Sequence, residues 1–298
     1  MNPIAVQFRG VHKRYPHFAL DDVSFDVPTG TITGFIGANG AGKSTTMRIL
    51  MGLTGHDGGT VDVLGHRIPE HAIAAKRQVG YVSEDMRLFP DATLDWHMQF
   101  IAKAFGHWDA DYARNLVRRF DLQPEQKIKG LSHGQRIKAS LLLALARRPG
   151  LLVLDEPTTG LDPVARQEVI GALTEAMQDE ARTVLFSSQN TLDVEQIADR
   201  IIFIDRGRIV DADDKEAYLD RWRRIRLETP TEGWVSHIDG AVATTVSGRT
   251  ATITTDRFSE AMLAACRAAG ATVHAVDRLT LEEIFVAGVM ARREEMAA

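Results

Sequence analysis

The stretch GANGAGKS, from Gly37 to Ser44, decides the fold of this 298-residue chain. It follows the apolar run GTITGFIG and opens the run AGKSTTMRILMGL, whose apolar residues recur at helical spacing. A strand, a glycine loop and a helix are therefore expected in that order. Glycines without side chains let successive backbone N–H groups wrap a phosphate at the N-terminus of the helix. The pattern G-x-x-x-x-G-K-S predicts a phosphate-binding loop, or P-loop, with an ordinary glycine turn as the alternative.

Three side chains at the end of this loop have separate expected roles. Lys43 is placed to neutralise the β and γ phosphates of a nucleoside triphosphate, and Ser44 to bind Mg²⁺ through its hydroxyl. Thr45 is within reach of the α phosphate. The other residues expected to line the phosphates are Gly37, Asn39, Gly40, Ala41 and Gly42.

A second stretch with expected chemistry is LLVLDEP, at residues 151–157. Its apolar part predicts a buried strand that ends at two adjacent carboxylates, Asp155 and Glu156. This placement suits a division of labour in which Asp155 binds magnesium through water and Glu156 polarises the water that attacks the γ phosphate. An acidic turn at a strand end is the alternative.

Between these two stretches lies LSHGQ, Leu131 to Gln135, directly before the helical run RIKASLLLALARR. Alone, this string would be an ordinary helix start with Ser132 as its capping residue. In this order after a P-loop it resembles the signature motif of ABC ATPases. The resemblance covers about Ile4 to Asp214 and implies a magnesium-dependent ATPase with ATP as ligand. It also implies that Ser132, Gly134 and Gln135 complete the nucleotide site of a second copy of the chain.

Two further family landmarks occur in the same order. Tyr15 in KRYPHFAL resembles the aromatic residue that stacks on adenine, although it could equally be a core or edge aromatic. The run GLDP, Gly160 to Pro163, resembles the loop that couples paired sites and places Asp162 at the seam of a dimer.

The chain departs from the family pattern at two positions. Glu84, in YVSED, stands where the family usually has glutamine, and we expect it to bind magnesium or its waters. Gln189, in LFSSQN, stands where the family usually has a histidine that contacts the γ phosphate. A glutamine amide can donate a hydrogen bond but cannot take up a positive charge. We therefore expect real but slow hydrolysis.

The expected fold class is α/β, an ABC ATPase fold of the P-loop NTPase type. It combines a β-rich N-terminal part, a mixed or parallel core sheet and an inserted helical subdomain at about 86–150. This domain is expected to span residues 1–218, and Trp96, Phe100 and Phe105 are expected in its core. A small α+β domain is expected at 219–298, with strands in RIRLET, TATITT and ATVHAV. Dimer stabilisation, gating and passive packing remain open roles for it.

Composition restricts the partners. The formal net charge of −5 provides no basic field that would gather nucleic acid, so no nucleic-acid partner is expected. Cys266 is the only cysteine, which excludes an intramolecular disulfide framework. No apolar run is long enough to span a membrane. The resemblance to ABC ATPases implies two partners, a second copy of the chain and, because no span is present, a separate transmembrane permease. The chain is then expected to be cytoplasmic and held at the inner face of the plasma membrane through the permease.

The closing run RLTLEEIF, at residues 278–285, resembles the end of prokaryotic multidrug and antibiotic exporter ATPases. This resemblance implies export of a drug, antibiotic or lipid-like compound. The expected docking surface for the permease lies around 84–90, where Met86, Leu88 and Phe89 would be exposed, unless this loop is buried. Two rivals remain: an ABC ATPase acting on DNA or the ribosome, and a regulatory module that holds ATP without efficient turnover.

Overall fold

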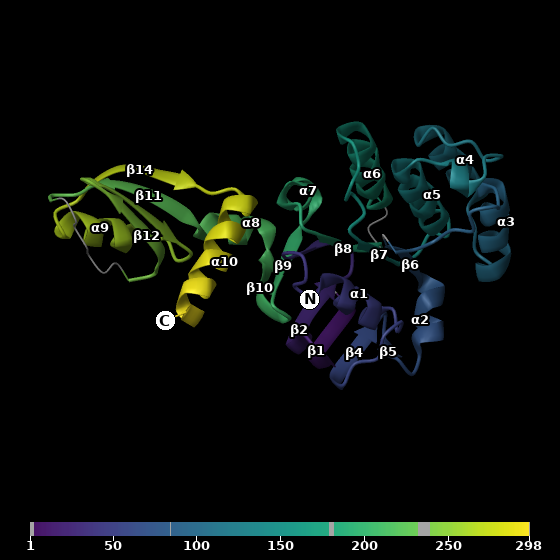
Figure 1. Ribbon diagram of the computed structural model, residues 1–298, viewed down its shortest axis with the longest axis horizontal. Helices are drawn as coiled ribbons and strands as arrows, with labels where there is room; N and C mark the ends of the chain where they lie inside the picture. Colours follow the sequence, from purple (N-terminus) through teal and green to yellow (C-terminus); the bar gives the residue numbers. More distant parts are fainter. Residues whose placement is uncertain (1–2, 84, 179–181, 232–238, 298) are drawn as a thin grey trace. The chain divides into compact units, whose positions relative to one another are not determined.

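The computed structural model describes residues 3–83, 85–178, 182–231 and 239–297 (Figure 1). The chain forms two compact units, Met1–Ala212 and Asp213–Ala298. The expected boundary at residues 218 and 219 lies inside helix α8 (Lys215–Arg221), which belongs entirely to the second unit. In the part of the chain that the structure describes, no helix is both long and apolar enough to cross a membrane.

The first unit contains two sheets. An antiparallel sheet with strand order β2-β1-β4-β5 is formed by β1 (Ile4–Tyr15), β2 (Phe18–Pro28), β4 (Gly58–Val63) and β5 (His66–Ile68). The second sheet has the order β10-β9-β3-β8-β7-β6, and all the pairings from β9 to β6 are parallel. Its strands are β3 (Ile32–Ile36), β6 (Val79–Ser83), β7 (Leu151–Asp155), β8 (Thr183–Ser188), β9 (Arg200–Asp205) and β10 (Arg208–Asp214).

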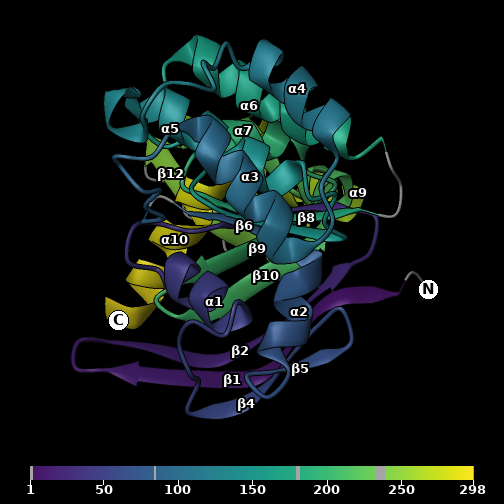
Figure 2. The same cartoon turned by 90° about the vertical axis from the view of Figure 1, so that its right-hand side faces the viewer.

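Helix α1 (Lys43–Leu50) lies between the two sheets (Figure 2). Met47 is fully buried there in one apolar cluster with side chains from both sheets. The rings of Phe8 and Phe25 stack in this cluster with their centroids 4.6 Å apart. Leu53, which the helical spacing places on the same face, instead lies beyond the end of α1 and is 57% exposed. The core therefore fixes α1, and with it the loop before it, between two layers. Helix α2 (Ala72–Gln78) follows β5.

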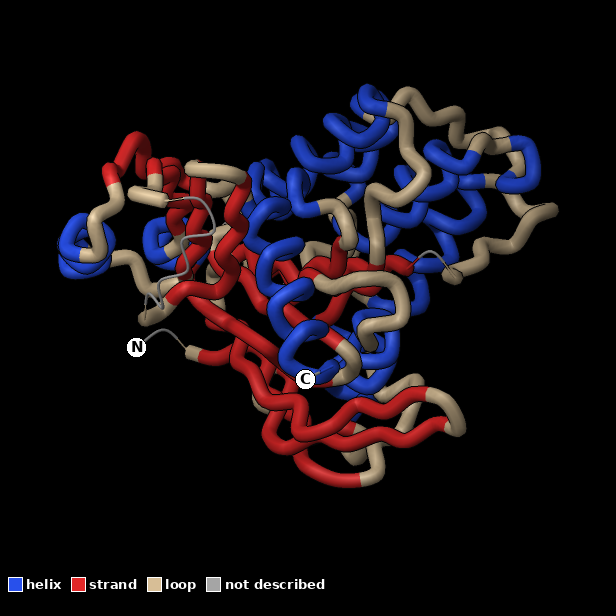
Figure 3. Tube along the Cα trace, turned by 60° about the vertical axis from the view of Figure 1, so that its left-hand side comes forward, coloured by secondary structure: helices blue, strands red, loops and turns tan. Residues whose placement is uncertain are grey.

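The remaining helices of this unit lie on the opposite face of the parallel sheet from α1 (Figures 1 and 2). They are α3 (Leu94–Phe105), α4 (Ala110–Arg119), the 3₁₀ turn η1 (Ile128–Gly130), α5 (His133–Leu145), α6 (Pro163–Ala176) and α7 (Thr191–Ile197). In α5 every residue from 139 to 145 is buried, so this helix is the centre of the helical layer. Figure 3 shows these helices gathered away from the strands of the antiparallel sheet.

The prediction that the aromatic residues of α3 belong to the core is wrong. Trp96 is 44% exposed, Phe100 49% and Phe105 39%. The residues of α3 that are buried are Leu94 and His97. Apolar residues at helical spacing identify one face of a helix, but they do not say which face another element covers.

The second unit is a small α+β domain with a sheet of order β12-β13-β11-β14. Its strands are β11 (Arg223–Glu228), β12 (Ala241–Ser247), β13 (Thr250–Thr255) and β14 (Thr272–Arg278), with helices α8, α9 (Glu260–Ala268) and α10 (Leu281–Ala297). Ile225, Leu227 and Ile253 form its core with Leu263 and Cys266 of α9. Strand β12 was not predicted, because it lies at the sheet edge and exposes small and polar residues.

Candidate functional site

The loop between β3 and α1 is shaped by two glycines. A Cβ atom at Gly37 would lie 2.5 Å from the carbonyl oxygen of Ile204, so a side chain there would require the backbone to move. Gly42 has φ 116°, which side chains rarely allow, and its Cβ would lie 2.7 Å from a methyl group of Leu20. Gly42 is also the N-cap of α1, and no side chain caps this helix end. The first N–H groups of α1 therefore stay open to an anion.

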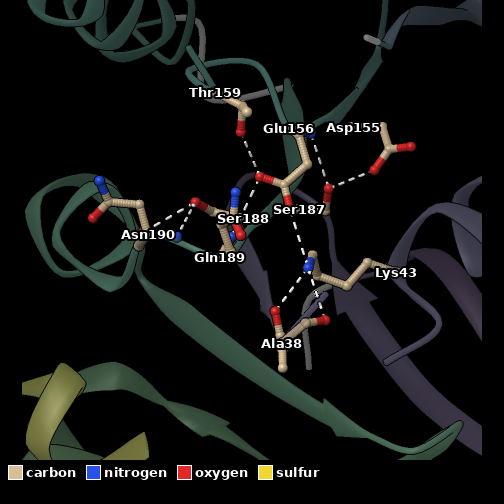
Figure 4. Close-up of polar contacts among 10 residues, drawn as sticks. Ala38, Lys43, Asp155, Glu156, Thr159, Ser187, Ser188, Gln189 and Asn190 are labelled. Atoms are coloured by element: carbon tan, nitrogen blue, oxygen red, sulfur yellow. Dashed lines mark hydrogen bonds and ion pairs between the residues drawn. The ribbon is translucent and has the colours of Figure 1, made fainter. Parts of the chain in front are cut away.

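Lys43, the first residue of α1, is 95% buried and points back into the loop (Figure 4). Its Nζ donates to the carbonyl oxygens of Gly37, at 2.7 Å, and Ala38, at 3.3 Å. Nζ also pairs with Oε1 of Glu156 at 3.0 Å. An ammonium group has three N–H donors, and all three have a partner here. A phosphate can reach Lys43 only by replacing one of these partners.

Asp155 and Glu156 stand at the end of β7, beside Ser187 of β8. The Ser187 hydroxyl donates to Oδ1 of Asp155 at 2.6 Å and accepts from the backbone N–H of Glu156 at 3.0 Å. Glu156 has φ 55°, an uncommon conformation for a residue with a side chain, and such conformations cluster at functional sites. The strand thus ends in a strained turn at the residue whose carboxylate meets Lys43.

The second carboxylate oxygen of Glu156 is held by the loop that follows it and by the residue after β8 (Figure 4). Oε2 accepts from the Thr159 hydroxyl at 2.8 Å and from the backbone N–H of Gln189 at 3.4 Å. The side chain of Glu156 is 12% exposed and Gln189 is exposed. The structure therefore brings together Lys43, Glu156 and Gln189, which come from three distant parts of the sequence.

Of the residues expected to bind a metal, the structure describes Ser44 and Asp155 but not Glu84. Ser44 and Thr45 are half-buried in the first turn of α1, and Asp155 is 94% buried. Among the described residues, no group of three His, Cys, Asp or Glu side chains could hold a metal ion. A metal here would need waters or phosphate oxygens as ligands in addition to one or two protein side chains, which suits Mg²⁺ because it usually keeps several waters and binds phosphates. The predicted ligand Glu84 lies outside the described residues.

Ser132 and Gln135 cap the N-terminus of α5 together. The Ser132 hydroxyl accepts from the backbone N–H of Gln135 at 3.2 Å, and Oε1 of Gln135 accepts from the backbone N–H of Ser132 at 2.9 Å. This is a complete capping box. Ser132 is exposed and Gly134 is half-buried. The helix start is therefore rigid, with the exposed serine at its end.

Asp162 caps the N-terminus of helix α6 with its own side chain. Its Oδ1 accepts from the backbone N–H groups of Val164, at 2.9 Å, and Ala165, at 3.0 Å. The hydrogen bond from Ala165 has the largest effect, and together with the bond from Val164 it lowers the pKa of the Asp162 carboxyl group. Asp162 itself is exposed.

Tyr15, the expected adenine partner, stands at the end of β1 and is 43% exposed. Its ring stacks on Phe18 with the centroids 6.4 Å apart, and Nζ of Lys13 lies 5.7 Å from the centre of the Tyr15 ring. The aromatic side chain is therefore partly exposed at this position, as stacking on a base requires.

Sequence reasoning missed Ser187 and Thr159, which fix the two carboxylates of the site. Both residues lie close in sequence to motifs that were recognised, Ser187 before Gln189 and Thr159 after Glu156. Their roles depend on the pairing of β7 with β8 and on the turn at Glu156, which the local sequence does not specify.

The comparisons with known proteins agree on one family. Residues 20–159 match the family model described as ABC transporter. Nod factor export ATP-binding protein I of Burkholderia orbicola is 35% identical over 215 residues, which are 70% of either chain. The protein of the same name from Ralstonia nicotianae is 35% identical over 67% of this chain and 64% of its own.

Solved structures support the same fold. One described as an ATP binding subunit of an ABC transporter has a TM-score of 0.67 and 27% identity, covering 72% of this chain and 92% of its own. A dimeric ATP-binding cassette, described as a post-hydrolysis state bound to ADP and Pi, has a TM-score of 0.62 over 70% of this chain and 98% of its own. Its identity of 21% supports the fold alone.

The chain belongs to the ATP-binding proteins of ABC transporters. The predicted α/β class and ABC ATPase fold are confirmed. The protein is an ATP-binding subunit of an ABC transporter, and its activity is ATP hydrolysis coupled to transport.

Proposed function

We propose that two copies of this chain bind ATP and Mg²⁺ between them and power a separate permease that exports a drug, antibiotic or lipid-like compound. The observation that carries the proposal is the contact between Lys43 and Glu156 at the uncapped start of α1. Export is supported by the relatives, which are named for Nod factor export. The chain would lie at the cytoplasmic face of the plasma membrane, bound to its permease.

The residues of the site divide the chemistry among them. Backbone N–H groups of residues 37–42 and the ammonium group of Lys43 bind the phosphates. Ser44 and Asp155 would hold Mg²⁺, with Glu84 proposed as a further ligand, and the metal would supply positive charge that neutralises the phosphates. Glu156 accepts a hydrogen bond from the attacking water, and Ser187 keeps Asp155 and Glu156 in place.

Magnesium-dependent phosphate release from the purified chain, alone and with its permease, tests this proposal. We expect release that needs Mg²⁺ and that rises per chain as the protein concentration rises. Absence of release under both conditions would contradict the ATPase mechanism and favour a module that only holds ATP.

The face that carries Ser132 and Asp162 supports pairing with a second copy. Both of these residues are exposed at helix starts, and the partial positive charge at the start of α5 favours an anion. Val164, beside Asp162, is 69% exposed, and Leu192, at the start of α7, is 54% exposed. Apolar side chains next to polar site residues are suited to burial by a partner. In the paired form, Ser132 and Gly134 would contact the nucleotide of the other copy.

Gln189 would act as a neutral donor to the γ phosphate, which makes slow turnover part of the proposal. Replacing Gln189 with histidine should raise kcat at pH 7 by about threefold or more, because a hydrogen bond from a charged donor is roughly twice as strong as a neutral one. Steady-state phosphate release measures this change. Gln196→His on α7 is the matched control, since Gln196 is also exposed. An unchanged or lower kcat for Gln189→His would contradict the assigned role.

The permease would bind an exposed aromatic cluster formed by Phe89, Trp96 and Phe100. Phe89 is 60% exposed, and its ring meets the edge of Trp96 at 5.6 Å between centroids. Trp96 stacks on Phe100 at 5.2 Å. Beneath them, the buried His97 donates from Nδ1 to the Thr93 carbonyl at 2.7 Å and accepts from the Phe89 N–H at 3.0 Å. The cluster is thus apolar, exposed and held by its own loop, as a docking surface requires.

The double substitution Phe89→Ala and Trp96→Ala should weaken permease binding by about 30-fold or more, because loss of a buried aromatic anchor costs about 2 kcal/mol or more at interfaces and neighbouring losses are not additive. ATP hydrolysis by the chain alone should stay unchanged. Pull-down with the detergent-solubilised permease measures the binding. Ile73→Ala is the control, because Ile73 is 78% exposed on α2 and outside the cluster. Equal binding by the double variant and the control would exclude this docking surface.

A further inference from the structure

His133, the first residue of α5, contacts the loop that carries the catalytic carboxylate. Its Nε2 lies 3.1 Å from the backbone carbonyl oxygen of Thr159. A carbonyl oxygen only accepts, so Nε2 must be the donor and carry a proton. The Thr159 hydroxyl in turn donates to Oε2 of Glu156 at 2.8 Å. A continuous path therefore runs from the start of α5 to Glu156.

The same loop, residues 156–162, is held from another side. The Thr158 hydroxyl donates to Oδ2 of Asp193 at 2.6 Å, and Asp193 is fully buried and paired with Arg166 at 2.5 Å. Gly160, at φ 71°, leaves room for the His133 ring, since a Cβ there would lie 3.2 Å from Nε2. Asp193 fixes the buried side of the loop, and His133 contacts it from an exposed position.

We propose that His133 is a positioning residue that couples the two ATP sites of the paired form. This inference rests on the proposed function, in which Ser132 serves the nucleotide of the other copy and Glu156 serves its own. His133 directly follows Ser132, so any displacement of the helix start by the other nucleotide acts on Thr159 through the Nε2 hydrogen bond. The orientation of the Glu156 carboxylate then depends on whether the other site is occupied.

The substitutions His133→Ala and His133→Gln test this role together. His133→Ala removes the donor, and it should lower kcat by about three- to tenfold, the range for one lost hydrogen bond. The Hill coefficient for ATP should fall towards one, while the Kd for ATP of the dilute monomeric chain stays unchanged. His133→Gln keeps an N–H donor and should retain most of kcat and the cooperativity.

His107→Ala is the matched control for these variants. His107 is also exposed, and its Nδ1 lies 3.1 Å from the carbonyl oxygen of Arg147, outside the 156–162 loop. The variant His107→Ala should keep the kcat and the Hill coefficient of the wild type. In addition, Thr159→Val removes the hydroxyl bond to Glu156, and its effect on kcat should not add to that of His133→Ala, because the two act through one path.

The outcomes separate this inference from the proposed function. Suppose that the wild type hydrolyses ATP cooperatively and that His133→Ala keeps both this cooperativity and the wild-type kcat. The coupling role of His133 is then wrong, while the proposal that two chains form each ATP site is unaffected. Equal losses in His133→Ala and His133→Gln would also overturn it, because the donor would then not matter. If the wild type itself shows no cooperativity and no dependence of activity on protein concentration, the proposal that two chains form each ATP site is contradicted. The proposed coupling through His133 is then contradicted as well.

Discussion

Replacing Glu156 with glutamine is expected to lower kcat for ATP hydrolysis by about 100-fold or more, the contribution typical of a positioned general base. The amide has nearly the same shape, but it cannot accept a proton or polarise water as a carboxylate does. The backbone position should survive, because the Ser187 hydroxyl bonds to the N–H of residue 156 and not to its side chain. Single-turnover phosphate release measures the loss.

The same substitution should leave ATP binding intact or tighten it. In the structure Glu156 occupies one of the three donors of Lys43, and a glutamine would hold the ammonium group less strongly. Titration with a fluorescent ATP analogue measures Kd. Glu175→Gln is the control, because Glu175 is also paired with a basic side chain, that of Arg119, but on the outer helices. A wild-type kcat in Glu156→Gln would remove Glu156 from the mechanism.

Replacing Lys43 with methionine should weaken ATP binding by about 30-fold or more, because a charge-assisted hydrogen bond contributes about 2 to 3 kcal/mol to binding. Two effects act in the same direction. The phosphates lose their buried cation, and the Glu156 carboxylate, 12% exposed, is left facing them without a counter-charge. Titration with the same ATP analogue measures the change in Kd.

The double variant Lys43→Met with Glu156→Gln separates these two effects. Removing the uncompensated carboxylate should restore part of the lost affinity, so that the double variant binds ATP more tightly than Lys43→Met alone. Lys129→Met is the control, because Lys129 is exposed and pairs with Asp91 at 2.7 Å. Unchanged affinity in Lys43→Met would contradict the phosphate site, and purely additive effects would show that the ion pair does not matter for binding.

The sequence predicted the parts of the site whose geometry is local. The run from β3 through GANGAGKS to α1 specifies a strand, a tight loop and a helix start, and neighbouring atoms leave no room for a side chain at Gly37 or Gly42. The buried strand LLVLD likewise predicted where Asp155 and Glu156 would emerge. Local patterns suffice here because the chemistry depends on residues close together in the chain.

The contacts inside the site could not be predicted from the sequence. The approach of Glu156 to Lys43 depends on a left-handed turn at Glu156 and on the order of the strands, β3 next to β8 and β8 next to β7. Burial of the α3 aromatics was predicted wrongly for a similar reason, since exposure depends on which elements cover a helix. Tertiary arrangement decides both features.

The central claim is that each ATP site is built from two chains, and mixing two inactive variants tests it most directly. Glu156→Gln lacks the carboxylate but keeps the start of α5, whereas Ser132→Arg blocks the start of α5 but keeps the carboxylate. A mixed pair contains one site with Glu156 from one chain and Ser132 from the other. We predict that the mixture hydrolyses ATP faster than the sum of the two variants measured separately. Activity equal to that sum would contradict a shared site.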